Sequence, residues 1–136
     1  MIAPDSSVLI AAIAPWHVAH APARDALAGS DSRLVAHVAY ESSSALSRMP
    51  AGHRIAAARV LEALDLNFPE RWLTLDGARA RSALQEAVGA GVRGGALYDA
   101  LIAATVQDNG ARLLTADRRA TSTYEAMGTQ TELLAP

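Results

Sequence analysis

The sequence predicts an α/β domain of three layers, in which helices cover both faces of a central, mainly parallel sheet. Short strand-like segments alternate along the chain with longer helical ones, which is typical of parallel sheets. The 136 residues suit one domain, 1–136, and 51% of them are hydrophobic, enough for a buried core. Segment 98–107 is very apolar, as expected for a helix packed inside the domain.

Proline and glycine set the limits of the predicted elements. Pro15 and Pro50 end helices that they cannot extend, and Gly110 closes another. Pro4 cannot donate to a sheet, so we expect the last hydrogen bond of the first strand to be missing. The expected strands are 2–5, 33–36, 72–75, 112–115 and 129–133. The expected helices are 7–14, 20–28, 38–49, 53–64, 78–90, 98–107 and 121–127.

The composition excludes several classes of chemistry. The chain has no cysteine, which excludes disulfides, thiolate metal sites and cysteine nucleophiles, and makes a cytoplasmic location the default expectation. All 12 basic residues are arginines, so the lysine of a P-loop and the lysine of a Schiff-base enzyme are absent. No apolar run reaches the roughly 20 residues that span a bilayer, so we expect no membrane partner.

Four acidic residues lie where the predicted fold would bring them together. Asp5 and Asp117 follow strands, and ligands of parallel sheets bind beyond such strand ends. Glu41 and Asp99 lie in helices among small or apolar neighbours, where a lone buried carboxylate is costly. Each alone has an ordinary explanation, such as a helix cap for Asp5 or Asp99 or a turn for Asp117. Together they favour a divalent metal, because Mg²⁺ and Mn²⁺ prefer carboxylate and water oxygens.

Motifs surround these acids in order over essentially the whole chain. They occupy residues 5–10, 41–50, 94–104 and 110–120, and Tyr124 continues the last one. They resemble the motifs of PIN-domain ribonucleases, and especially those of VapC toxins from toxin–antitoxin pairs. The resemblance implies a PIN-like three-layer fold and cleavage of RNA by an enzyme that needs Mg²⁺ or Mn²⁺. It also implies inhibition by a cognate VapB-type antitoxin.

The resemblance assigns roles position by position. The acidic positions around the metal are matched by Asp5, Glu41, Asp99 and Asp117. Ser7 and Thr115 match the polar residues that orient these acids. Pro4 departs from the family, which usually has a plain apolar strand residue there.

The arginines are the residues available for contact with RNA. Setting aside the four site acids leaves 10 of the 14 acidic residues against 12 arginines, a surplus of two positive charges. Arg118 follows the fourth acid and is a candidate contact for a substrate phosphate. The alternative is that Arg118 or Arg119 pairs with a nearby acid. We also expect a homodimer.

Two other functions stay open beside the predicted Mg²⁺- or Mn²⁺-dependent endoribonuclease. One is a haloacid-dehalogenase-like phosphatase with Asp5 as nucleophile, although that family's pattern has a second aspartate where this chain has Ser7. The other is a PIN-like fold that only binds RNA or protein, which the loss of one acid would favour. All four acids are present, and a metal held by them would activate water to attack a phosphodiester.

Overall fold

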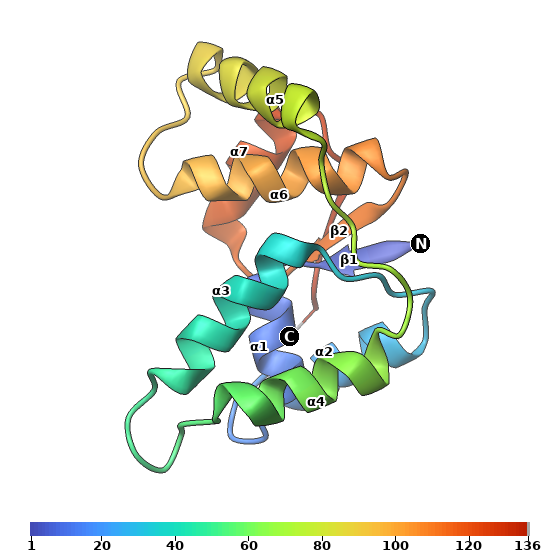
Figure 1. Cartoon of the computed structure of the whole chain (residues 1–136), viewed down its shortest axis with the longest axis vertical. Coiled ribbons are helices and arrows are strands. Elements are labelled where there is room, and N and C mark those ends of the chain that lie inside the picture. The colour runs from blue at the N-terminus through green and yellow to red at the C-terminus, as the bar shows by residue number, and fades with distance from the viewer. Residues whose placement is uncertain (136) are drawn as a thin grey trace.

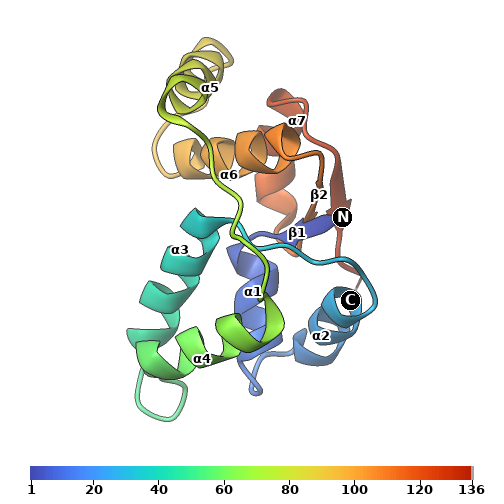
Figure 2. The same ribbon diagram turned by 45° about the vertical axis from the view of Figure 1, so that its right-hand side comes forward.

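The sheet lies between two layers of helices. The computed structural model describes residues 1–135; residue 136, the last of the predicted domain, lies outside the described residues. Three parallel strands pair in the order β1 (Ile2–Pro4), β2 (Arg112–Thr115) and β3 (Thr131–Leu133). The helices are α1 (Ser6–Ile13), α2 (His20–Ala28), α3 (Ala36–Ser47), α4 (Ala57–Asn67), α5 (Gly77–Gly89), α6 (Ala96–Asp108), the short 3-10 helix η1 (Arg118–Ala120) and α7 (Thr121–Ala126). Helices α1 to α4 lie on one side of the strands and α5 to α7 on the other (Figures 1 and 2). The predicted three-layer α/β/α fold with a parallel sheet is confirmed.

Pro4 has a different effect from the one expected. Beyond it, the N–H of Asp5 donates to the carbonyl of Leu114 over 2.9 Å, so the predicted loss of the strand's last hydrogen bond is wrong. On the opposite side of β1, Ile2 pairs with Ser32 through an isolated bridge. Pro4 lies two residues further along and its backbone faces that same side, where it has no N–H to donate. The sheet is therefore poorly continued on this side.

Two of the predicted strands, 33–36 and 72–75, do not form. Their pairing is limited to one isolated parallel bridge between Val35 and Leu73. Both side chains are buried, which accounts for the apolar pattern that suggested strands. The missing donor of Pro4 leaves segment 33–36 without a continuous partner, and α3 begins directly after Val35.

The helices agree with the sequence more closely than the strands do. Six predicted helices begin and end within two residues of α1, α2, α3, α5, α6 and α7. The helix predicted at 53–64 is displaced, because the N–H of Ile55 donates to the carbonyl of Leu46 and ties this segment to the end of α3. Residue Ala56 is then extended, and α4 begins only at Ala57. The last strand, predicted at 129–133, is shorter than expected. The N–H of Thr129 donates to the carbonyl of Tyr124 in α7, so β3 begins only at Thr131.

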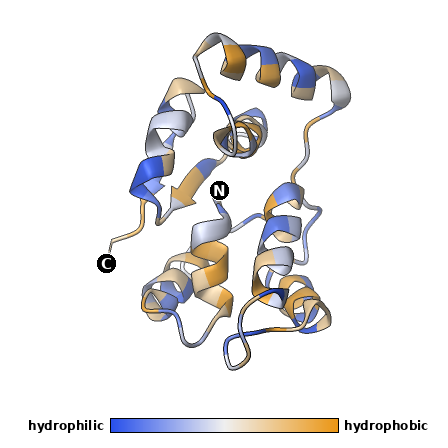
Figure 3. Ribbon diagram, turned by 90° about the vertical axis from the view of Figure 1, so that its left-hand side faces the viewer, coloured by the Kyte–Doolittle hydropathy of each residue, from blue (hydrophilic) through white to orange (hydrophobic). Residues whose placement is uncertain are grey.

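The core lies where α1 and α6 meet the sheet. The ribbon of α1 is largely hydrophobic (Figure 3), and α6 buries Ala100 and the whole run from Ile102 to Val106. Leu9 of α1, Ile102 of α6 and Leu113 of β2 are each at most 1% exposed. Full burial of such side chains contributes about 1.5–3 kcal/mol each to folding. The packing fixes the ends of β1, α1 and α6, which carry acidic residues. No helix within residues 1–135 has the length and hydropathy needed to cross a membrane.

Candidate acidic active site

Asp5 is the most tightly held of the predicted site residues. It is 3% exposed and forms the N-cap of α1. Its Oδ1 accepts hydrogen bonds from Ser7 Oγ over 2.5 Å and from the N–H of Val8 over 3.2 Å. Its Oδ2 accepts one from the hydroxyl of Tyr124 over 2.7 Å. Hydrogen bonds to an ionised acceptor are roughly twice as strong as neutral ones, so three donors hold this buried carboxylate in one place.

Asp117 lies just beyond β2 and is half-buried. Its Oδ1 accepts a hydrogen bond from the N–H of Arg119 over 2.9 Å and caps η1. The buried hydroxyl of Thr115 accepts one from the N–H of Asp117 over 3.0 Å. Ser7 therefore touches a site carboxylate directly, whereas Thr115 fixes the backbone that carries one.

Glu41 comes from the middle of α3. Its Oε2 lies 3.7 Å from Nε2 of His37, which is close enough for an ion pair and too far for a hydrogen bond. Its Oε1 is buried without a hydrogen-bond partner. The ring of His37 stacks on that of Tyr98 with centroids 5.3 Å apart. Glu41 therefore offers a carboxylate oxygen that no donor among residues 1–135 satisfies.

Asp99 lies in the first turn of α6 and is half-buried. The N-cap of this helix is Gly95, and no side chain caps it. The explanation of Asp99 as a helix cap is therefore wrong. Its carboxylate lies in the electrostatic field of the other site acids.

Asp99 lies within range of the charges of the other three acids. Burial, followed in order of importance by repulsion from Glu41, Asp5 and Asp117, raises the pKa of Asp99 to about 6. Burial and the charge of Asp5 also raise the pKa of Glu41, against the opposing attraction of His37. Asp99 of α6 is therefore within electrostatic range of one acid from α3 and of the acids that follow β1 and β2.

The residues suit a hydrated divalent cation. Among residues 1–135, no three histidine, aspartate or glutamate side chains converge closely enough to form a ready-made metal site. However, Mg²⁺ usually keeps several waters and takes only one or two carboxylates from a protein. The all-oxygen donor set matches its preference, and Glu41 Oε1 is a buried acceptor in need of a partner. The metal site with all four carboxylates as ligands stays a prediction.

The two arginines beside Asp117 differ in their surroundings. Arg119 has a side chain that is 95% exposed, with Nε 3.7 Å from Asp117 Oδ1. Arg118 is also exposed, and it forms no ion pair within the described part of the chain. The expected pairing of one arginine with a nearby acid therefore involves Arg119, which leaves Arg118 available to a ligand.

Sequence reasoning missed two residues that contact the acids. His37 precedes Glu41 by four residues, a spacing that places both on one helix face, and this signal was available. Tyr124 continues the fourth motif, which assigns it no role. Its bond to Asp5 joins residues 119 positions apart, so no local pattern could indicate it.

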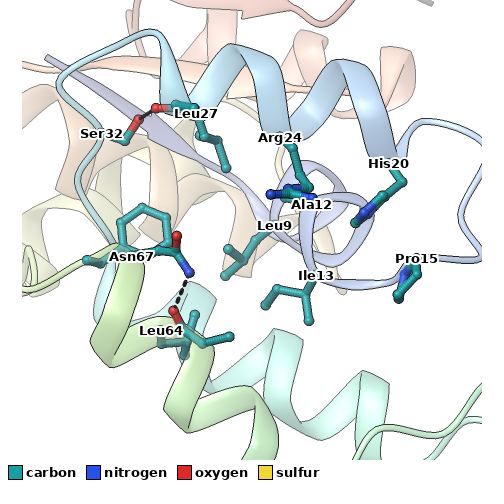
Figure 4. Close-up of a pocket in the computed structure, with 13 residues that line it drawn as sticks. Leu9, Ala12, Ile13, Pro15, His20, Arg24, Leu27, Ser32, Leu64 and Asn67 are labelled. Atoms are coloured by element: carbon teal, nitrogen blue, oxygen red, sulfur yellow. Dashed lines mark hydrogen bonds between the residues drawn. The ribbon is translucent and has the colours of Figure 1, made fainter.

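A separate apolar groove lies between α1, α2 and α4 (Figure 4). Its volume is about 410 Å³, and it contains none of the four acids. Leu9, Ile13, Leu27 and Leu64 supply apolar walls, and the pocket is also lined by basic side chains. Asp5 and Leu9 are one turn apart on α1, so the groove begins close to the acidic site.

Known proteins resemble this chain both in sequence and in fold. A family model for the PIN domain matches residues 2–126. Ribonuclease VapC40 of Mycobacterium tuberculosis is 42% identical over 134 residues, which cover 98% of this chain and 99% of that protein. Two solved structures share the fold. FitAB bound to a DNA fragment gives a TM-score of 0.75 at 20% identity, covering 98% of this chain and 94% of that chain. The Mycobacterium tuberculosis toxin VapC20, which cleaves the sarcin-ricin loop, gives 0.70 at 22%, covering 95% and 96%.

Proposed function

This chain belongs to the PIN-domain family, and from that premise we propose that it is a metal-dependent endoribonuclease of the VapC kind. The observation that carries the proposal is the shared field of four carboxylates, in which the pKa of Asp99 rises to about 6. Crowded acids repel one another and destabilise the metal-free protein, and strongly perturbed carboxylates gather at active sites. The 42% identity to a ribonuclease over nearly the whole chain supports RNA as the substrate.

The acids would hold Mg²⁺ or Mn²⁺ together with its water. The ligands we propose are Asp5, Glu41, Asp99 and Asp117. When bound, such a metal activates water and neutralises charge that builds on the phosphodiester. The chain's own contribution is positional: Ser7 and Tyr124 fix Asp5, and Thr115 fixes the turn before Asp117. Arg118 would hold a neighbouring phosphate.

Cleavage of RNA in the presence and absence of metal tests this function. We expect the purified protein to cut RNA from a panel of tRNA, rRNA and single-stranded oligonucleotides with Mn²⁺, and to stop in EDTA. The products should carry a 5′-phosphate and a 3′-hydroxyl, because metal-activated water and not the ribose 2′-OH is the nucleophile. Asp99→Asn should be inactive, whereas Asp65→Asn, an exposed aspartate on α4, should retain activity. A 2′,3′-cyclic phosphate, or undiminished cleavage in EDTA, contradicts the mechanism.

The alternatives are separated by the same assay. A binding module would retain RNA in a gel-shift experiment and cleave none of the panel with either metal. A phosphatase would need Asp5 as an accessible nucleophile. The burial of Asp5 and its three hydrogen bonds argue against that role.

We also propose a VapB-type antitoxin as partner. Four carboxylates form an anionic site that an arginine of the antitoxin can occupy in place of a metal. The apolar groove between α1, α2 and α4 suits an apolar segment of the same partner, because it begins one helical turn from Asp5. The similarity of the fold to FitAB, a structure bound to DNA, fits a partner that binds DNA.

Co-expression tests the partner. The protein alone should arrest growth, and the neighbouring gene should restore it. Ala63→Arg in the groove should weaken the rescue, because Ala63 is only partly buried, whereas Leu66→Arg, which changes an exposed residue of the same helix, should not. Harmless expression of a protein that is active when purified would remove the toxin assignment and leave the nuclease one. Light scattering tests the predicted homodimer.

A further inference from the structure

The contact between Tyr124 and Asp5 gives the tyrosine a role beyond packing. The hydroxyl of Tyr124 donates to Asp5 Oδ2 over 2.7 Å, and the two residues are 1% and 3% exposed. We propose that Tyr124 is a positioning residue, which fixes Asp5 Oδ2 as the single oxygen that Asp5 offers to a divalent cation. This inference rests on the metal-dependent function proposed above.

The hydrogen bonds of Asp5 leave little room for another partner. A carboxylate has about four acceptor positions, two on each oxygen. Ser7 Oγ and the N–H of Val8 take both positions on Oδ1. Tyr124 takes one of the two on Oδ2. The remaining acceptor position belongs to Oδ2, so a cation at Asp5 is bound through one oxygen, and Tyr124 holds that same oxygen.

The fold makes Tyr124 a rigid donor. Its ring is buried, and its backbone carbonyl accepts a hydrogen bond from the N–H of Thr129 over 3.1 Å, which closes α7. A tyrosine side chain has only two rotatable bonds before its hydroxyl, so burial of the ring leaves little freedom. The hydroxyl is protonated at neutral pH and can only orient itself toward the carboxylate as a donor.

A simpler alternative is that Tyr124 only compensates the buried charge of Asp5. In that case its hydroxyl stabilises the metal-free protein and gives a metal no advantage. The two roles predict opposite changes in metal affinity. Loss of a partner that orients a metal ligand typically weakens metal binding 10- to 100-fold. Loss of a group that only compensates charge leaves metal binding unchanged or makes it tighter.

The variant Tyr124→Phe separates these roles, because it removes the hydroxyl and keeps the ring. We expect Mn²⁺ affinity, measured by titration calorimetry without RNA, to fall about tenfold or more. Thr129→Val is the matched control: it removes another buried hydroxyl, which donates to the carbonyl of Ala103 over 3.0 Å. That variant should melt at a lower temperature in EDTA and bind Mn²⁺ as the wild type does.

A measurement on the wild type covers the case in which Tyr124→Phe does not fold. Buried tyrosine hydroxyl protons exchange slowly enough to be followed by NMR during a titration with diamagnetic Mg²⁺. The Tyr124 hydroxyl proton should stay protected and hydrogen-bonded when the Asp5 carboxyl signal shifts. Its loss on Mg²⁺ binding, or unchanged or tighter Mn²⁺ binding by Tyr124→Phe, overturns the inference. A wild type that binds neither ion overturns the proposed metal-dependent function itself.

Discussion

The hydroxyl of Ser7 accepts a hydrogen bond from the N–H of Ala116 over 2.9 Å, and the two residues are 109 positions apart in the chain. The same hydroxyl donates to Asp5. Ser7 thus connects the carboxylate at the end of β1 to the turn that follows β2 and carries Asp117. One small side chain sets the relative positions of two proposed metal ligands.

Replacement of Ser7 by alanine should therefore affect the site more than the fold. We expect unfolding free energy to fall by about 1–2 kcal/mol, the usual cost of leaving partly buried hydrogen-bonding groups without partners. The rate of RNA cleavage should fall by about tenfold or more, because Asp5 loses a donor. Ser6→Ala, a change at the preceding residue, is the control for denaturant unfolding and kinetics. Equal effects of both substitutions would show that Ser7 has no special role, and Ser7→Thr should restore much of the lost activity.

Asp99→Asn should abolish cleavage yet stabilise the metal-free protein. The pKa of Asp99 is about 6 in the folded protein and near 3.8 when unperturbed, so the native state holds its proton more tightly. The contribution to stability is present at low pH and is lost as pH rises through about 6. One pKa unit corresponds to about 1.4 kcal/mol, and screening of this half-exposed group reduces the total, so we expect a gain on the order of 1 kcal/mol at neutral pH.

Thermal melts of both proteins test this expectation. In EDTA at pH 7.5 the variant should melt at the higher temperature, and at pH 4.5 the difference should shrink. Mn²⁺ should stabilise the wild type by mass action and the variant less. A variant that is less stable in EDTA, with equal Mn²⁺ shifts for both proteins, would show that Asp99 stabilises the fold without binding metal.

The sequence predicts the parts of this site that depend on neighbouring residues, and it misses those that depend on contacts between residues far apart in the chain. The position of Asp5 after a strand and before a helix follows from local sequence, and so does the apolar character of α6. The strand expected at 33–36 does not form because a donor is missing at Pro4, which lies far from it in the sequence, and segment 72–75 has only this segment as a partner. The bond between Tyr124 and Asp5 was unpredictable for the same reason, since it depends on how α7 packs.

Binding of Mn²⁺ should weaken as the solution becomes more acidic. Carboxylates must be deprotonated to bind a metal, and the pKa of Asp99 is about 6, while that of Glu41 is also raised. We expect Mn²⁺ affinity to be highest above pH 7 and to fall steeply between pH 6.5 and about 5. Calorimetry across this range, at constant ionic strength, provides the measurement. An affinity that stays constant down to pH 5 would mean that neither Asp99 nor Glu41 contacts the ion.

The variants Arg118→Ala and Arg119→Ala each remove one positive charge, so a difference between them cannot come from net charge. Arg118 is exposed without an ion pair among the described residues, whereas Arg119 lies beside Asp117. If Arg118 holds a phosphate, Arg118→Ala should weaken RNA binding several-fold and lower the slope of log Kd against log salt by about 0.7, the value for one phosphate contact of a single strand. Arg119→Ala should change binding little, because exposed ion pairs contribute about 0–1 kcal/mol.

Binding is best measured in the Asp99→Asn background, where we expect no cleavage. Equal effects of the two substitutions would show general attraction by positive charge, and a larger effect at Arg119 would assign the phosphate contact to that residue.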